Sequence, residues 1–136
     1  MRMPEEMPDA LLAPCGIACV LCHHHCREAD PCPGCREGQG HSSHCRLCAL
    51  RRCAADRGLL WCAQCSEFSC APLTAFNEFY RRTYGFTFLQ NADLMRSAGR
   101  EAMVKRLTHQ WRCPDCGGVI CIHDGLCSEC GRPMAT

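Results

Sequence analysis

The sequence has few of the residues that build a large apolar core. It contains five phenylalanines, two tryptophans and two tyrosines among 136 residues. A chain of this length buries only a limited share of its surface even with a good core. Small proteins that lack such a core are usually stabilised by disulfides or by metal ions.

Long apolar runs are also missing. No stretch approaches the ~20 apolar residues that a membrane-spanning helix needs, so we expect no membrane association. Residues 1–7, MRMPEEM, lack the apolar segment of a secretory signal. We therefore expect a cytoplasmic protein in a reducing compartment, where disulfides seldom persist.

The net charge is small, with 15 Lys and Arg against 14 Asp and Glu. This balance treats every cysteine as neutral. Each zinc ion on four thiolates would add about −2, so a metal-loaded chain would be acidic. Bulk charge therefore gives little support for nucleic-acid binding.

Cysteine, in contrast, is abundant, with 17 residues. An odd number fits a closed set of disulfides poorly, and metal ligation is the better account in a reducing compartment. Fifteen of these cysteines are candidate metal ligands: Cys15, Cys19, Cys22, Cys32, Cys35, Cys45, Cys48, Cys53, Cys62, Cys65, Cys70, Cys113, Cys116, Cys127 and Cys130.

The cysteines divide the chain into regions. We expect a flexible leader over residues 1–14, a cysteine-rich metal-binding module over 15–71, a helical connector over 72–111 and a zinc ribbon over 112–132. The predicted fold class is a small metal-stabilised α+β protein. It would combine an irregular cysteine-rich N-terminal module with short helices, a two-helix connector and a C-terminal β zinc ribbon.

Helical spacing of apolar residues predicts the two connector helices. The first begins near Pro72 and ends at Gly85. The second begins with Asn91 as its N-cap and extends to about Gln110. Gly99 weakens this second helix by roughly 1 kcal/mol relative to alanine.

The C-terminal cysteines follow the pattern C-x2-C-x10-C-x2-C, with glycine after each pair. Such pairs form tight turns that place two thiolates on the same side, and two turns complete a tetrahedral zinc site. Residues 119–122 are predicted as a strand and 123–125 as its turn. Four cysteines leave no open coordination position, so the zinc would be structural. Cys121 is interpreted as a small buried residue and His123 as solvent-facing.

The N-terminal module leaves the metal and its ligand grouping open. Cys15, Cys19 and Cys22 follow a C-x3-C-x2-C spacing, and Cys26 adds a fourth cysteine that departs from the ferredoxin pattern. The spacing C-x2-C-x4-C occurs twice, starting at Cys45 and Cys62. We expect zinc or an iron–sulfur cluster here. Residues 23–25, three consecutive histidines, are alternative ligands, although a polar loop beside a completed site is the preferred interpretation.

Several of these motifs together resemble a family of cysteine-rich intracellular proteins known as a domain of unknown function. The sequences CGIAC at 15–19, CPGC at 32–35, CALRRCA at 48–54 and CAQCSEFSC at 62–70 carry the resemblance. The segment from Asn91 to Gly131 is similar to the family's C-terminal plan. The CHHHC sequence at 22–26 departs from it, since members commonly have Cys-Pro and an apolar run there. The resemblance implies a metal-binding domain and no specific activity.

The function expected from these features is a multi-site metal-binding protein, foremost a zinc-stabilised adaptor or regulatory binding module with a protein partner. Nucleic acid is the weaker candidate partner, suggested by arginines near tyrosines: Arg46, Arg51, Arg52, Arg57, Arg81 and Arg82, with Tyr80 and Tyr84. The same cysteines also suit an iron–sulfur protein in electron transfer or redox sensing, or a metal store or sensor. A nucleophile–base pair is not recognisable, so we do not expect an enzyme, although a catalytic metal with an open position would also be compatible with the cysteines.

Overall fold

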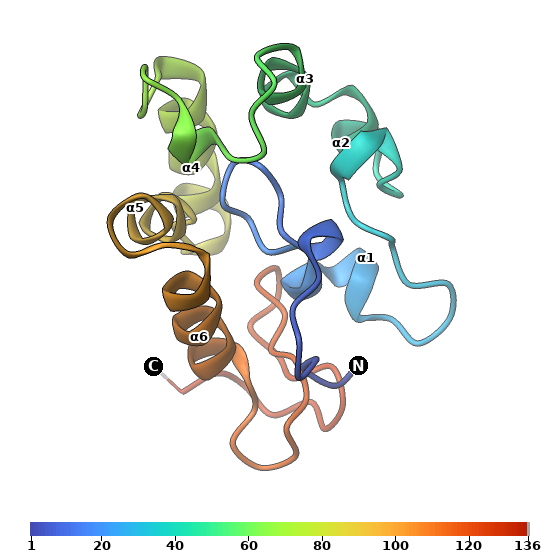
Figure 1. Cartoon of the computed structure of the whole chain (residues 1–136). Helices are drawn as coiled ribbons and strands as arrows, with labels where there is room; N and C mark the ends of the chain where they lie inside the picture. The colour runs from blue at the N-terminus through green and yellow to red at the C-terminus, as the bar shows by residue number, and fades with distance from the viewer. Residues whose placement is uncertain (136) are drawn as a thin grey trace.

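The computed structural model describes residues 1–135 and is mostly helical (Figure 1). Helices make up 48% of the chain, and strand or bridge residues only 7%. The α-helices are α1 (His23–Cys26), α2 (Ser43–Leu47), α3 (Ala49–Asp56), α4 (Ala71–Tyr84), α5 (Leu89–Ala98) and α6 (Arg100–Trp111). Short 3-10 helices are η1 (Asp9–Leu11), η2 (Cys19–Leu21), η3 (Arg36–Gly38) and η4 (Cys62–Gln64).

The predicted α+β class with a C-terminal β ribbon is wrong. Within residues 1–135 the β pairs are isolated bridges, including Arg112 with Val119 and Ile120 with Cys127, and they form no sheet. The reason lies in the turns of this segment, because 113–117, 121–125 and 127–131 are each closed by a hydrogen bond between residues four apart. Too few residues remain between these turns to extend a bridge into a ladder.

The connector also differs from the prediction in its second half. Helix α4 ends at Tyr84 and is followed by Gly85, as expected. The predicted second helix is instead two helices, α5 and α6, which are separated by Gly99 with φ 90° and ψ 174°. This conformation is easily reached only by glycine. Asn91 is not an N-cap: it is buried in the first turn of α5, and its side-chain amide donates to the Gly16 carbonyl at 3.0 Å.

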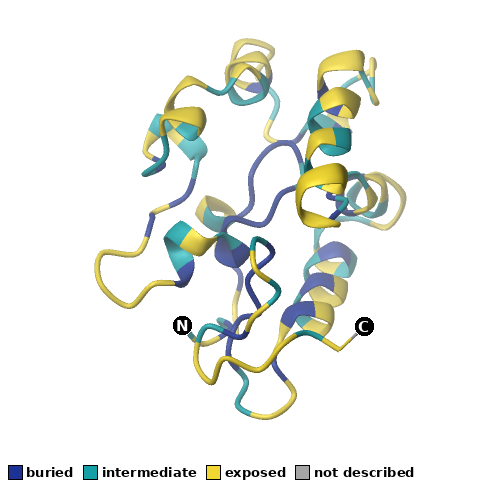
Figure 2. Cartoon of the chain, turned by 180° about the vertical axis from the view of Figure 1, so that it is seen from behind, coloured by how far each residue is buried: buried dark blue, intermediate teal, exposed yellow. Residues whose placement is uncertain are grey.

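The apolar core joins the start of the chain, the connector helices and the C-terminal loops. Phe88, Leu73 and Leu107 are almost completely buried, and Val119 of the C-terminal segment is buried with them. Figure 2 shows the buried stretches in the centre and lower half of the molecule, while the outer sides of the helices are exposed. The core therefore links segments that are distant in sequence.

Residues 1–3 lie against the C-terminal loops, as the neighbouring N-terminal and C-terminal colours in Figure 1 show. The Met3 N–H donates to the Gly117 carbonyl at 3.2 Å, and the Val119 N–H donates to the Met1 carbonyl at 2.9 Å. The side chains of Met3 and Met7 are buried. The first residues of the chain thus help to position the loop that carries Cys113 and Cys116.

Among the described residues, no helix is long and apolar enough to span a membrane.

Candidate metal centre

Two turns of the same geometry present the C-terminal cysteines. In the first, the Gly117 N–H donates to the Cys113 carbonyl at 2.9 Å, and the Cys113 N–H donates to the Gly118 carbonyl at 2.8 Å. In the second, the Gly131 N–H donates to the Cys127 carbonyl at 2.9 Å, and the Cys127 N–H donates to the Arg132 carbonyl at 2.8 Å. Each turn brings its two thiols to one side of the backbone, where they face the other turn.

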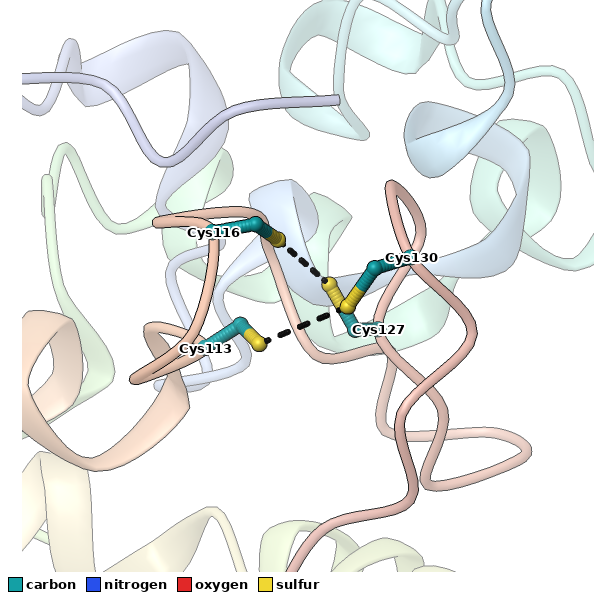
Figure 3. A group of neighbouring side chains, drawn as sticks. All are labelled: Cys113, Cys116, Cys127 and Cys130. Carbon is teal, nitrogen blue, oxygen red and sulfur yellow. Dashed lines mark hydrogen bonds between the residues drawn. The ribbon is translucent and has the colours of Figure 1, made fainter.

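The sulfur atoms of Cys113, Cys116, Cys127 and Cys130 converge between these turns, and we call them the four-cysteine group. All four lie within 4.8 Å of one another. Cys113 Sγ is 3.7 Å from Cys130 Sγ, and Cys116 Sγ is 3.5 Å from Cys127 Sγ (Figure 3). These distances far exceed the ~2.05 Å of a disulfide bond, and the cysteines are free thiols. The group could hold a metal ion.

Gly118 explains why two glycines follow Cys116. A Cβ atom at this position would lie 2.7 Å from Cys127 Sγ and 2.7 Å from Cγ of Glu129. Carbon atoms do not approach sulfur so closely without displacing it. Glycine at 118 therefore lets the two cysteine turns come together, so that their sulfurs are close enough to share one ion.

The acidities of these thiols reflect their crowding. Burial opposes ionisation of Cys127, but N–H groups of Cys130 and Glu129 and the neighbouring thiols outweigh it, so its pKa falls from 9.0 to about 7. The Gly118 N–H favours the Cys116 thiolate, yet burial and the surrounding sulfurs raise its pKa to about 12. One thiol thus ionises readily while its neighbour resists. A bound cation would remove this conflict by compensating the thiolate charges.

The N-terminal cysteines are less closely gathered. Within residues 1–135, three or more ligand atoms come within 4.8 Å of one another in the four-cysteine group and in a second group of Cys22, His23 and His123. No such group forms among the other N-terminal candidates: Cys15, Cys19, Cys32, Cys35, Cys45, Cys48, Cys53, Cys62, Cys65 and Cys70.

Partial grouping is nevertheless visible in that module. Cys53, Cys62, Cys65 and Cys70 line one pocket, together with apolar side chains that include Leu73. These four residues come from both copies of the repeated C-x2-C-x4-C spacing. Cys19, near the start of the module, is hydrogen-bonded to Cys35. This bond raises the pKa of Cys19 and lowers that of Cys35 to about 7.

The sequence pattern did not reveal the role of His123, which contacts the N-terminal module instead of facing only solvent. Its ring lies 4.4 Å from the His23 ring, and its Nδ1 accepts the His23 N–H at 3.3 Å. Cys121 likewise meets Cys26, and a hydrogen bond between the two thiols lowers the pKa of Cys121 and raises that of Cys26. A signal existed in the sequence, because Cys121 and Gly125 have the same spacing as Cys113 and Gly117.

Comparison with known proteins adds a family likeness for the N-terminal half. Residues 11–75 match a family described as "Protein of unknown function (DUF3795)". The match covers the cysteine-rich module and the beginning of α4 and leaves the four-cysteine group outside it. It indicates a domain of unknown function and names no activity. No curated protein and no solved structure matches the chain.

Replacing Gly118 with alanine should weaken metal binding by the four-cysteine group. We expect the affinity to fall about 10- to 100-fold, the usual effect of disturbing a residue that supports a metal ligand. Competition with a colorimetric zinc chelator measures this change. Gly58→Ala is the control, since the carbon added at Gly58 has no neighbour within 4 Å. Gly58 has a positive φ, which Gly118 does not share, so this variant carries backbone strain but no clash with a ligand. The control should retain its metal, and equal metal loss in both variants would contradict the steric argument.

Proposed function

We propose that this chain is a zinc-stabilised adaptor in which the four-cysteine group holds one Zn²⁺. The main support is the spacing of the sulfurs. A tetrahedral site with Zn–S bonds near 2.3 Å separates its sulfurs by about 3.8 Å, close to the observed 3.5 and 3.7 Å. The thiolates around a four-iron cubane lie roughly 6 Å apart, and such a cluster would not fit between sulfurs that are all within 4.8 Å.

The position of this site favours a structural role for the ion. Four cysteines close the coordination sphere and leave no position for a substrate. The loops that carry them bond to Met1 and Met3, and Cys113 follows the end of α6 closely. Holding the loops together would therefore fix the start of the chain and α6 as well. Such a role requires reduced thiols, in keeping with a cytoplasmic location.

An aromatic surface supports the adaptor part of the proposal. Phe79 and Tyr84 of α4 are 52% and 36% exposed, and their ring centroids are 6.3 Å apart. The Tyr84 ring lies 4.7 Å from the ring of His123 in the C-terminal segment. The surface thus joins α4 to the segment that contains the four-cysteine group. Exposed aromatic side chains are enriched in protein–protein interfaces, so a protein partner is favoured.

The arginines that suggest nucleic-acid binding are largely used within the chain. Arg46 donates to the His41 carbonyl at 2.9 Å, and Arg51 donates to the Arg46 carbonyl at 2.9 Å. Arg81 and Arg82 both pair with Glu78. Because these guanidinium groups have internal partners, fewer of their N–H donors are free to bond phosphate oxygens. A protein partner is therefore the better proposal.

An iron–sulfur cluster in the N-terminal module is the second candidate. Cys53, Cys62, Cys65 and Cys70 border a common pocket, yet no three of their sulfurs lie within 4.8 Å. This wider arrangement suits a polynuclear cluster better than a single zinc ion. In that case the protein would combine a structural zinc with a centre for electron transfer or redox sensing.

Metal analysis of the anaerobically purified chain tests the zinc proposal. Cys127→Ser should lose one zinc ion per chain because serine replaces one of four thiolate ligands. Cys19→Ser is the matched control and should keep the zinc of the four-cysteine group. An unchanged zinc content in Cys127→Ser would contradict the proposal.

The optical spectrum tests the second candidate, the iron–sulfur cluster. Broad absorption near 400 nm that Cys62→Ser abolishes supports a cluster, and a colourless protein containing only zinc excludes it.

The adaptor role predicts that partner binding depends on the exposed aromatic side chains. In cross-linking coupled to mass spectrometry, the double variant Phe79→Ser/Tyr84→Ser should lose specific partners of the wild-type chain. Its zinc content and melting temperature should stay close to those of wild type, since both side chains are substantially exposed. Leu47→Ser is the control because Leu47 is also exposed but lies on α2. Identical cross-linked partners for all three proteins would argue against this surface.

A further inference from the structure

A second cluster of metal-ligating side chains lies where the N-terminal module meets the C-terminal segment. Cys22, His23 and His123 place one ligand atom each within 4.8 Å of the other two. The cluster shares no residue with the four-cysteine group. Cys22 is the N-cap of α1 and His23 is its first residue, whereas His123 is distant in sequence. The two parts of the cluster are thus brought together only by folding.

Backbone contacts hold these two parts in place. The Ile122 N–H donates to the Leu21 carbonyl at 3.0 Å, so the residues next to the cluster are joined directly. The His23 N–H donates to His123 Nδ1 at 3.3 Å, and the two rings meet edge to face at 4.4 Å. Leu21 and Ile122 are buried. The backbone on both sides of the cluster is therefore fixed by buried neighbours.

The turn that carries His123 has the same geometry as the two turns of the four-cysteine group. The Gly125 N–H donates to the Cys121 carbonyl at 2.9 Å, and the Cys121 N–H donates to the Leu126 carbonyl at 2.9 Å. The His123 N–H donates to Cys121 Sγ at 3.4 Å, as the Glu129 N–H does to the sulfur of Cys127. The same backbone arrangement therefore occurs a third time. Here Cys121 and Asp124 stand at the positions of the paired cysteines, and His123 stands at the position of Asp115 and Glu129.

We propose that Cys22, His23 and His123 form a second metal site, which binds one Zn²⁺ through three protein ligands. One thiolate and two imidazoles are a donor set that suits zinc. Cys121 Sγ is 4.0 Å from His123 Nδ1, but it does not lie within 4.8 Å of all three ligand atoms. The fourth coordination position is thus left to water.

This donor set and its exposure give the site different properties from the four-cysteine group. His23 is exposed, and Cys22 and His123 are partly buried. A zinc ion with three protein ligands and a solvent-accessible face exchanges faster than one enclosed by four thiolates. The ion would also cross-link α1 to the 121–125 turn and fix the His123 ring beside Tyr84. The second site therefore acts as an exchangeable metal clamp between the two halves of the chain.

Zinc counting on the full-length chain tests this site. The zinc-loaded wild type should release one ion per chain to a colorimetric chelator in a fast phase, at least tenfold faster than the ion of the four-cysteine group. The double variant His23→Ala/His123→Ala should lack this fast phase and contain one zinc fewer. His24→Ala is the matched control, since His24 is the next residue of α1 but is outside the cluster. It should behave like wild type.

A measurement on the unmodified protein avoids any effect of the substitutions on folding. Long-range proton–nitrogen correlation spectra of the histidine rings should show a large shift of one ring nitrogen in both His23 and His123 when Zn²⁺ is added. The ring nitrogens of His109, which is exposed, should not move. Unchanged spectra of His23 and His123, or a fast zinc phase that persists in the double variant, would overturn the proposal. Cys127→Ser should keep the fast phase, which separates this site from the four-cysteine group.

Discussion

The convergence of four thiols within 4.8 Å is the constraint on which the C-terminal part of the structure depends. Two thiolates about 4 Å apart repel each other by about 4 kcal/mol near a protein surface. Four of them cannot be ionised together unless a cation lies between them. The opposite pKa shifts of Cys127 and Cys116 express this conflict. A divalent ion would turn the repulsion into attraction and make the group a stabilising centre.

The four-cysteine group and the apolar core involve the same segments of this chain. Cys113 and Cys127 are part of the buried core together with Met3 and Val119. The core is modest, and its C-terminal portion is built from turns joined by single β bridges instead of a sheet. Such turns have few backbone bonds between them. Zinc ligation would therefore supply the connection that a β-sheet provides in a larger domain.

The sequence predicted local features well and long-range ones poorly. The cysteine pairs with their glycines identify two turns, and the apolar spacing after Pro72 identifies α4. From the sequence, Gly99 is expected only to weaken one long helix, by about 1 kcal/mol. That cost does not show that Gly99 adopts a φ of 90° and divides the segment into two helices. The β ribbon was wrong because turns closed by bonds four residues apart leave no room for strands. The contact of His123 with His23 arises from tertiary packing that a local pattern cannot show.

The most direct test of this account is an anomalous difference map at the zinc absorption edge from crystals of the full-length protein. The account predicts one peak surrounded by Cys113, Cys116, Cys127 and Cys130, with each sulfur at about 2.3 Å. It is contradicted if no peak lies between these sulfurs, if they are joined in pairs at about 2.05 Å, or if several metal atoms occupy the group.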